Sequence, residues 1–361
     1  TFTGSFKLPL NNEGNVYISG EGSVQHKFEK KWTPDAEKNI NTSSDSNIIL
    51  DCTLFQLFSS FKLNKTNTLQ ITAGRAFTSD LSGMVFSQPS DGLLLKYSTP
   101  RVELSGYGGY SGLQNSKNVS IATSKGVVWS PKDEKKLYDF AAPYANGSVC
   151  LTFPYVWLNQ TVSFEGMGVW NVKGPADFSA DAEKPDVKDD KRLYGTMMLT
   201  GPLYNTVFYT ASATLETNDF SNKALLGQLG INAFLPWKSM TVNFKGVYSS
   251  ADKGPFASFV TYTKQTACAS KDDLMLKDVI KFGGSTSILP VNILFLSAGA
   301  DAVYKYNAED KSYEYFGTQF TGSGKLNLAS DLDASLTVTD FVGKKSSDSK
   351  LEIAVGVNLA L

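Results

Sequence analysis

The sequence has a single histidine and few cysteines, and these two shortages exclude much chemistry at the outset. His26 is the one histidine in 361 residues. Most hydrolase mechanisms need a histidine as general base, and most zinc sites need one as a ligand. The three cysteines, Cys52, Cys150 and Cys268, are odd in number and form no CxxC pair, so neither a disulfide framework nor a zinc site is indicated. We therefore expect no catalytic residue, no metal and no cofactor.

A long apolar run is also missing, although 42% of the residues are hydrophobic. No stretch approaches the 18 or so apolar residues of a transmembrane helix. The formal net charge is −1, so no overall charge excess favours binding to nucleic acid. The mean hydropathy of −0.17 still permits a membrane β-barrel, because only alternate residues of its strands face lipid. The chain begins with Thr1 and shows no basic and apolar leader, so we expect that a signal peptide has been removed.

What the sequence does have is alternation with a period of two. In the last eleven residues, 351–361, every odd position is Leu, Ile or Val, and every even position is small or polar. Such a segment predicts a β-strand with one aliphatic face, because successive side chains of a strand point to opposite faces. The same pattern recurs over 161–172, 206–216 and 332–339. A soluble sandwich could end with this strand, and so could a membrane barrel, whose strands need about 9–11 residues to cross.

The lengths of the connections favour the barrel. Short breaks, several of them containing proline, alternate with long polar connections along the chain. Short turns on one side and long loops on the other are typical of outer-membrane barrels. A propeller would show a repeat of about 40–50 residues, and the sequence has none. We therefore predict an all-β fold in which residues 1–361 form one transmembrane antiparallel up-and-down β-barrel domain.

Counting from the short turns predicts sixteen strands. The first covers roughly 15–30 and the last covers 351–361, so both ends lie on the short-turn side, as an even count requires. Residues 1–13 are then an extra segment on the periplasmic side or inside the lumen. If 256–267 and 274–282 both cross the membrane, the count becomes eighteen.

With these features the chain resembles a bacterial outer-membrane porin of the sixteen- or eighteen-strand type. The local match is Ala73-Gly74-Arg75, followed by Asp80 and then Ser90-Asp91-Gly92-Leu93, because substrate-selective porins often have a similar Gly-Arg at a strand top and an Asp-Gly opening the next strand. The resemblance also implies that the loop after the fifth strand folds into the barrel. That connection is 111–147, which is the longest in the chain.

Charged residues on the polar parity of the strands, together with Tyr107, are the candidate pore lining, since charges facing lipid are costly. These are Lys96, Arg101, Glu103, Tyr107, Glu165, Lys245 and Glu352. The alternative is a solvated wall that fills a closed lumen. The loop 111–147 has five lysines against three acidic residues, a sum of 5 − 3 = +2. Its candidate constriction residues are Lys132, Asp133, Glu134, Lys135, Lys136 and Asp139. The alternative for this loop is an external, solvated position.

Three classes of function remain open. The first is a channel in the bacterial outer membrane for passive diffusion of small hydrophilic solutes or ions, because a barrel of about sixteen strands leaves an aqueous lumen unless it is plugged. The second is an adhesion or structural surface protein with a closed lumen. The third, an outer-membrane enzyme, is disfavoured by the lone His26. The expected partners are outer-membrane lipid and small solutes, with no nucleic acid, in a monomer or a homotrimer.

Overall fold

The computed structural model describes residues 2–34, 40–113, 119–124, 126, 128–129, 144–172, 190–218, 222–329 and 332–359. These residues confirm the all-β class: they form 21 strands and two short 3-10 turns, η1 (Trp237–Ser239) and η2 (Ser346–Asp348). Within these ranges no helix is long and apolar enough to cross a membrane. Seventeen strands belong to one sheet, and the remaining four form two small ribbons. The chain divides into two compact units, residues 1–150 with 167–191 and residues 151–166 with 192–361.

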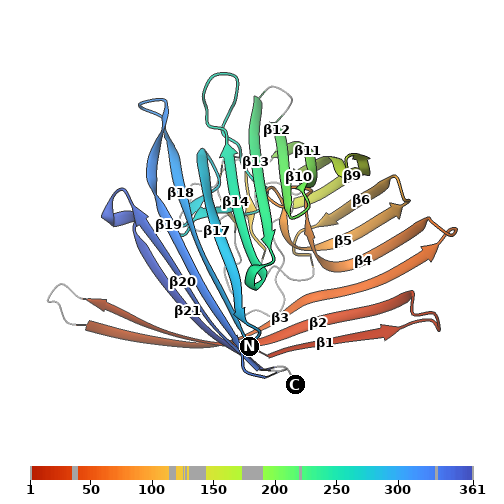
Figure 1. Ribbon diagram of the computed structural model, residues 1–361, viewed down its shortest axis with the longest axis horizontal. Coiled ribbons are helices and arrows are strands. Elements are labelled where there is room, and N and C mark those ends of the chain that lie inside the picture. Colours follow the sequence, from red (N-terminus) through yellow and green to blue (C-terminus); the bar gives the residue numbers. More distant parts are fainter. Residues whose placement is uncertain are drawn as a thin grey trace. The chain divides into compact units, whose positions relative to one another are not determined.

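The first unit is a meander in which each strand pairs antiparallel with the next along the chain (Figure 1). Its strands are β1 (Phe2–Pro9), β2 (Val16–Pro34), β3 (Ile40–Lys62), β4 (Thr68–Ser79), β5 (Ser87–Ser98) and β6 (Glu103–Tyr110). The turn before β2 closes when the Leu10 N–H donates to the Val16 carbonyl at 2.8 Å. Residues 2–9 therefore pair with β2 as a strand of the sheet, although we expected 1–13 to be an extra segment outside the strand count.

Part of the long 111–147 connection packs against this unit. Its described residues include a two-stranded ribbon, β7 (Ile121–Ala122) with β8 (Val128–Trp129). Val119 and Ile121 are buried, and the Ser120 N–H donates to Gln88 Oε1 on β5 at 2.9 Å. At least this portion of the connection therefore lies against the strands.

Two strands contribute residues to both units. They are β9 (Tyr144–Trp157) and β10 (Gln160–Asn171), which pair with each other. The turn between them uses positive φ at Leu158 (47°) and Asn159 (61°). A left-handed backbone is tolerated by Asn but is costly for Leu, so this turn is held by the pairing of the two strands.

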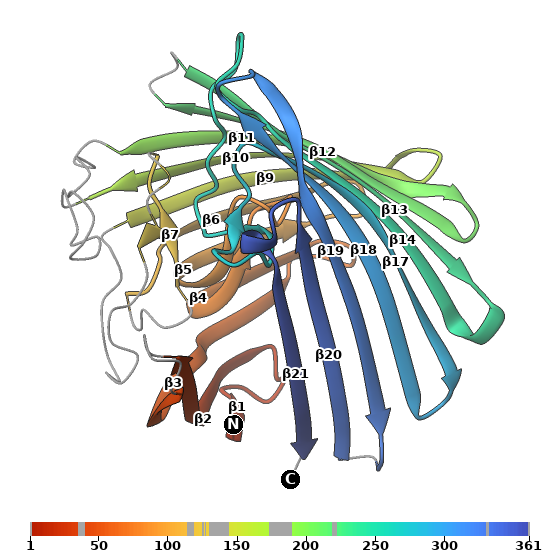
Figure 2. The same ribbon diagram turned by 90° about the vertical axis from the view of Figure 1, so that its left-hand side faces the viewer.

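The second unit is a longer meander, whose last strands lie side by side in chain order in Figure 2. Its strands are β11 (Lys191–Tyr204), β12 (Val207–Asn218), β13 (Asn222–Leu235), β14 (Met240–Ser249), β17 (Val279–Val291), β18 (Leu294–Asn307), β19 (Ser312–Asn327), β20 (Leu332–Gly343) and β21 (Lys350–Leu359). β1 pairs with β2 at one end of the whole series and β21 pairs with β20 at the other. The expected count of sixteen strands is not confirmed, because the sheet has seventeen strands and β1 is the additional one. Closure into a barrel is not confirmed either, since no pairing that closes the series is found among the described residues.

Residues 250–277, between β14 and β17, do not add strands to the sheet. They contain only the small ribbon β15 (Thr266–Cys268) with β16 (Leu274–Met275). The alternative of eighteen strands, with 256–267 and 274–282 both crossing, is therefore wrong. Most of this segment is coil and not strand, because it makes its contacts with side chains of distant strands, as described below.

The alternation predicted from the sequence is visible in the exposure of the side chains. On β10 the exposed residues include Phe164 and Trp170, whereas Ser163 and Glu165 are 2% and 8% exposed. On β21 the aliphatic residues are exposed, as are Glu352 and Ala354 on the other face, and Val355 reaches 76%. The large apolar side chains exposed on both strands depart from the usual arrangement of a water-soluble protein, in which apolar side chains are inside.

Candidate functional site

The polar face of the second unit is organised in rows that the strand register defines. One row places Thr210, Gly230, Lys245, Gly283, Asp301 and Gln319 opposite one another on six consecutive strands of the unit. The next row places Asn232, Asn243, Ser285, Gly299 and Thr321 opposite one another. Because side chains of one row point to the same face, the two rows gather amides, hydroxyls and charges in one area.

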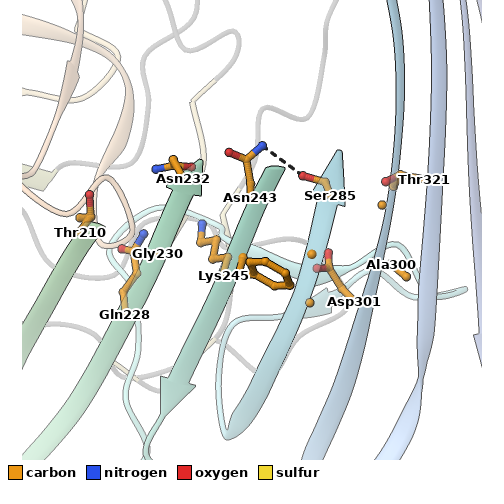
Figure 3. Close-up of a pocket in the computed structure, with 14 residues that line it drawn as sticks. Thr210, Gln228, Gly230, Asn232, Asn243, Lys245, Ser285, Ala300, Asp301 and Thr321 are labelled. Carbon is orange, nitrogen blue, oxygen red and sulfur yellow. Dashed lines mark hydrogen bonds between the residues drawn. The ribbon is translucent and has the colours of Figure 1, made fainter. Parts of the chain in front are cut away.

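These rows enclose an open pocket of about 400 Å³. Figure 3 shows the side chains of Asn243 and Lys245 on β14 and of Asp301 on β18, and the Asn243 Nδ2 donates to Ser285 Oγ at 3.4 Å. Gly230, Gly283 and Gly299 leave the floor of the pocket without side chains. The volume is within the range of small-molecule sites, about 300–1,000 Å³.

Two charged residues, Lys245 and Asp301, line this pocket, and Lys281 pairs with Asp301 from beside it. Lys281 Nζ is 3.1 Å from Asp301 Oδ2, and both side chains are partly exposed. Lys245 is on β14, opposite Gly283 and one strand away from Lys281. Lys245 was predicted to line a pore, whereas Lys281 and Asp301 were not identified from the sequence.

The segment 250–277 covers the same polar face at one end of the strands (Figure 2). The Val260 N–H donates to Glu216 Oε2 at 2.7 Å, and the Tyr194 hydroxyl donates to the Val260 carbonyl at 2.8 Å. Arg192 Nη1 donates to the Thr261 carbonyl at 3.4 Å. The segment is therefore fastened to β11 and β12 through side chains of buried residues.

Its other half is fastened to different strands. Lys281 Nζ donates to the Ala267 carbonyl at 2.8 Å, and the Ala269 N–H donates to Gln319 Oε1 at 2.8 Å. The Lys271 N–H donates to the Asp348 carbonyl in η2 at 3.1 Å. Apolar side chains add to these bonds, since Phe259 and Tyr262 are fully buried. The segment thus crosses the polar face from β11 to the β20–β21 connection and is held there by hydrogen bonds and by buried apolar side chains.

The residues that carry the porin resemblance form a buried ion pair in the first unit. Arg75 and Asp91 are opposite each other on β4 and β5, with Nη1 and Oδ2 3.2 Å apart and side chains 0% and 4% exposed. Arg75 Nε also donates to the Cys52 carbonyl on β3 at 2.8 Å. Gly74 has φ +121°, and a Cβ there would collide with the Phe55 carbonyl oxygen. The glycine of this motif therefore permits the close approach of β3 and β4 beside the ion pair.

The remaining predicted residues lie in several environments. Lys96 Nζ and Glu103 Oε1 form an ion pair of 2.7 Å at the β5–β6 turn, and the Tyr107 hydroxyl donates to Ser90 Oγ at 2.6 Å. Arg101 is exposed in that same turn, two residues before the first residue of β6, the strand on which we placed it. Glu165 is buried on β10.

Glu352 is exposed on β21, where its Oε1 is 2.6 Å from Lys350 Nζ. The loop residues Lys132, Asp133, Glu134, Lys135, Lys136 and Asp139 lie outside the described residues. That any of these residues lines a pore stays a prediction.

Sequence reasoning missed most of the pocket. Gln228, Asn232, Asn243, Ser285 and Thr321 are ordinary polar positions of alternating strands, and nothing local distinguishes them. Asp301 gives a usable indication, because it is an acidic residue in the middle of the otherwise small and apolar run 294–304. Lys281 gives a second one, since it interrupts an apolar strand start.

Comparison with known proteins identifies the fold and not the family. Neither a family model nor a curated protein matches the chain. Among solved structures, OccK5 (OpdH) of Pseudomonas aeruginosa is similar with a TM-score of 0.51 and 8% identity, covering 99% of this chain and 95% of that one. A loop L8 deletion mutant of OmpT, an outer membrane protein of Vibrio cholerae, has a TM-score of 0.44 and 10% identity, covering 92% and 98%. These neighbours are β-barrels, and the similarity to OccK5 shows that this chain has a related all-β antiparallel fold.

Proposed function

We propose that this protein is a bacterial outer-membrane β-barrel that forms a channel for passive diffusion of small hydrophilic solutes. The main observation behind this proposal is that, within each unit, large apolar side chains are exposed while polar side chains are buried. Leu351, Ile353 and Val357 of β21 are 61–68% exposed, and Phe77 of β4 is 66% exposed. An apolar surface of this extent is unfavourable in water, whereas a lipid bilayer solvates it.

The polar face supports the channel part of the proposal. A channel that passes hydrophilic solutes needs a wall of hydrogen-bonding and charged groups. The two rows of the second unit supply amides, hydroxyls, one lysine and an aspartate, and they surround an open pocket. Residues of this kind on a lipid-facing surface would be costly, at about 2–4 kcal/mol for a lysine at the bilayer midplane.

A second candidate, a structural or adhesive surface protein with a closed lumen, is favoured by one observation. Segments fold onto the strands in both units, the described residues of 119–129 in the first and 250–277 in the second. Segments that filled the lumen would block diffusion. The absence of catalysis stays a prediction on either account.

Liposome swelling separates the two candidates. Purified protein reconstituted into liposomes should admit arabinose faster than a trisaccharide such as raffinose, because a passive pore sieves by size. Boiled protein provides the control for nonspecific leakage. Liposomes that exclude both sugars while the protein is folded and inserted would exclude the channel and favour the closed-lumen candidate.

A further inference from the structure

The pocket of the second unit presents one carboxylate oxygen above a bare floor. Asp301 on β18 is opposite Gly283 on β17, which is in turn opposite Lys245 on β14. A Cβ placed on Gly283 would collide with Asp301 Oδ1. Asp301 Oδ1 therefore lies over Gly283, in the space between Asp301 and the strand that carries Lys245 (Figure 3).

Lys281 positions this carboxylate. Its Nζ is 3.1 Å from Asp301 Oδ2 and 2.8 Å from the Ala267 carbonyl of the segment 250–277. These two partners hold the ammonium group in place, and the ammonium group holds Oδ2. The other carboxylate oxygen, Oδ1, is left directed over the floor of the pocket. Lys281 is thus a positioning residue, because it orients the Asp301 carboxylate so that Oδ1 can accept a hydrogen bond from a ligand.

The charges at the pocket disfavour simple ions of either sign. Lys245, Lys281 and Asp301 sum to 2 − 1 = +1. A small anion near Lys245 meets the carboxylate of Asp301, and a small cation near Asp301 meets two ammonium groups. A neutral hydroxyl has neither conflict, because it can donate to a carboxylate oxygen and accept from an ammonium group.

The rest of the wall has the same dual character. Gln228, Asn232 and Asn243 each carry an amide oxygen that accepts and an amide nitrogen that donates. Thr210, Ser285 and Thr321 carry hydroxyls, which both donate and accept. Such a wall matches a ligand whose own groups are hydroxyls on several adjacent atoms.

We propose that this pocket is a binding subsite for a neutral polyhydroxylated solute of monosaccharide size. One hydroxyl donates to Asp301 Oδ1, a neighbouring hydroxyl accepts from Lys245, and further hydroxyls meet the amides of the second row. The inference deepens the proposed channel function by naming a solute class, although binding itself does not require conduction. The pocket volume of about 400 Å³ accommodates a ligand of this size.

Saturation-transfer NMR on the full-length protein in detergent micelles tests the subsite, with D-glucose, D-gluconate and D-glucosamine as probes. We expect D-glucose to bind, and Asp301→Ala to weaken its binding about tenfold, the effect of losing one hydrogen bond to a charged group. Gly283→Ala should also weaken it, because the added Cβ would collide with Asp301 Oδ1 and with the backbone of Ala300 and Asp301, and so displace the carboxylate. Lys245→Met removes the other charged group of the pocket. Because this side chain is exposed and the Lys281–Asp301 ion pair is left intact, the variant should fold even if the Asp301 variants do not.

Two controls match these variants. Asp333→Ala removes the carboxylate of another 3.1 Å lysine–aspartate pair, with Lys325, outside the pocket. Gly246→Ala adds a methyl group at a strand glycine with open space around its Cβ position. Both should bind D-glucose like the unmodified protein.

The inference is overturned if the Asp301, Gly283 and Lys245 variants bind D-glucose as tightly as the two controls. It is also overturned if D-gluconate or D-glucosamine binds more tightly than D-glucose, because the pocket would then select a charge. Potassium chloride conductance in a planar bilayer reports separately on the proposed function. Glucose binding without conductance would contradict the proposed channel and support the subsite. Conductance without glucose binding would support the channel and contradict the subsite.

Discussion

At the scale of single residues, the ion pairs of this chain fall into buried and exposed classes with different expected effects. Arg75 and Asp91 are almost completely buried and 3.2 Å apart. Lys96 and Glu103 form a shorter pair of 2.7 Å, but both side chains are 36% exposed. Solvent screens an exposed pair strongly, so its contribution to stability is small even when its geometry is good.

The first prediction follows from this contrast. Arg75→Met leaves the Asp91 carboxylate buried without its charge partner and should destabilise the folded protein by about 3–5 kcal/mol. Lys96→Met, the matched change in the exposed pair, should cost less than about 1 kcal/mol. Urea unfolding of both variants in detergent measures the difference. Equal midpoints for the two variants would contradict the assigned burial of the Arg75 pair.

The second prediction concerns Asp278, which precedes β17 outside the strands. Burial raises the pKa of the Asp278 carboxyl, against a smaller opposing effect of a hydrogen bond from Ser258. The folded state therefore binds this proton more tightly than the unfolded state does. The group costs no stability below its unfolded-state pKa, and the cost grows as pH rises through the window up to the raised folded-state pKa.

Asp278→Asn removes that cost. We expect the variant to unfold at a higher temperature than the unmodified protein at pH 7 and at the same temperature at pH 3. Circular dichroism melts at the two pH values provide the comparison. A variant less stable at pH 7 would show that the ionised carboxylate is stabilising and would reverse the assigned sign.

At the scale of elements, β21 is the strand that the sequence describes most completely. Val355 is opposite Leu336 and Ala354 is opposite Thr337, so the two neighbours point to different faces of the same pair of strands. If the aliphatic face contacts lipid, Val355→Arg should cost about 2–4 kcal/mol near the bilayer midplane. Ala354→Arg, on the opposite face, should assemble normally. Folding yields into liposomes measure both, and equal yields would refute the assignment of faces.

The segment 250–277 is the second element with a testable role. Replacing 255–275 with a short Gly-Ser linker removes the contacts with Glu216, Arg192 and Gln319 and uncovers the polar face. We expect a larger single-channel conductance, because chain that packs over a channel wall excludes water and ions from it. Replacing the exposed turn 308–311 with the same linker is the control and should leave conductance unchanged. Unchanged conductance in both variants would place 250–277 outside the conducting path.

The strands were predictable because their pattern is local. Alternation over 206–216 and 351–359 is read from neighbouring residues, and the structure has β12 and β21 there. The residues of β1 alternate equally well, but we left them out of the strand count because a membrane barrel was expected to have an even number of strands. The conformation of 250–277 and the meeting of Asp301 with Lys281 depend on register between distant strands, which no local pattern encodes.

At the scale of the whole molecule, the two units share one chemical arrangement. Phe77, Leu93 and Leu104 are exposed in the first unit, where Gln88 and Ser90 are buried. In the second unit Leu193 and Met197 are exposed, whereas Thr196 and Glu216 are buried. The same inversion in both units is what a membrane-embedded wall around a polar interior requires.

Single-channel recording in a planar lipid bilayer tests this account most directly. Purified, folded protein added to one side of the bilayer should produce stepwise increases of current in potassium chloride, since each inserted molecule adds one polar path through the lipid. Boiled protein should produce none. Insertion of folded protein, verified by flotation with liposomes, without any current steps would contradict the channel.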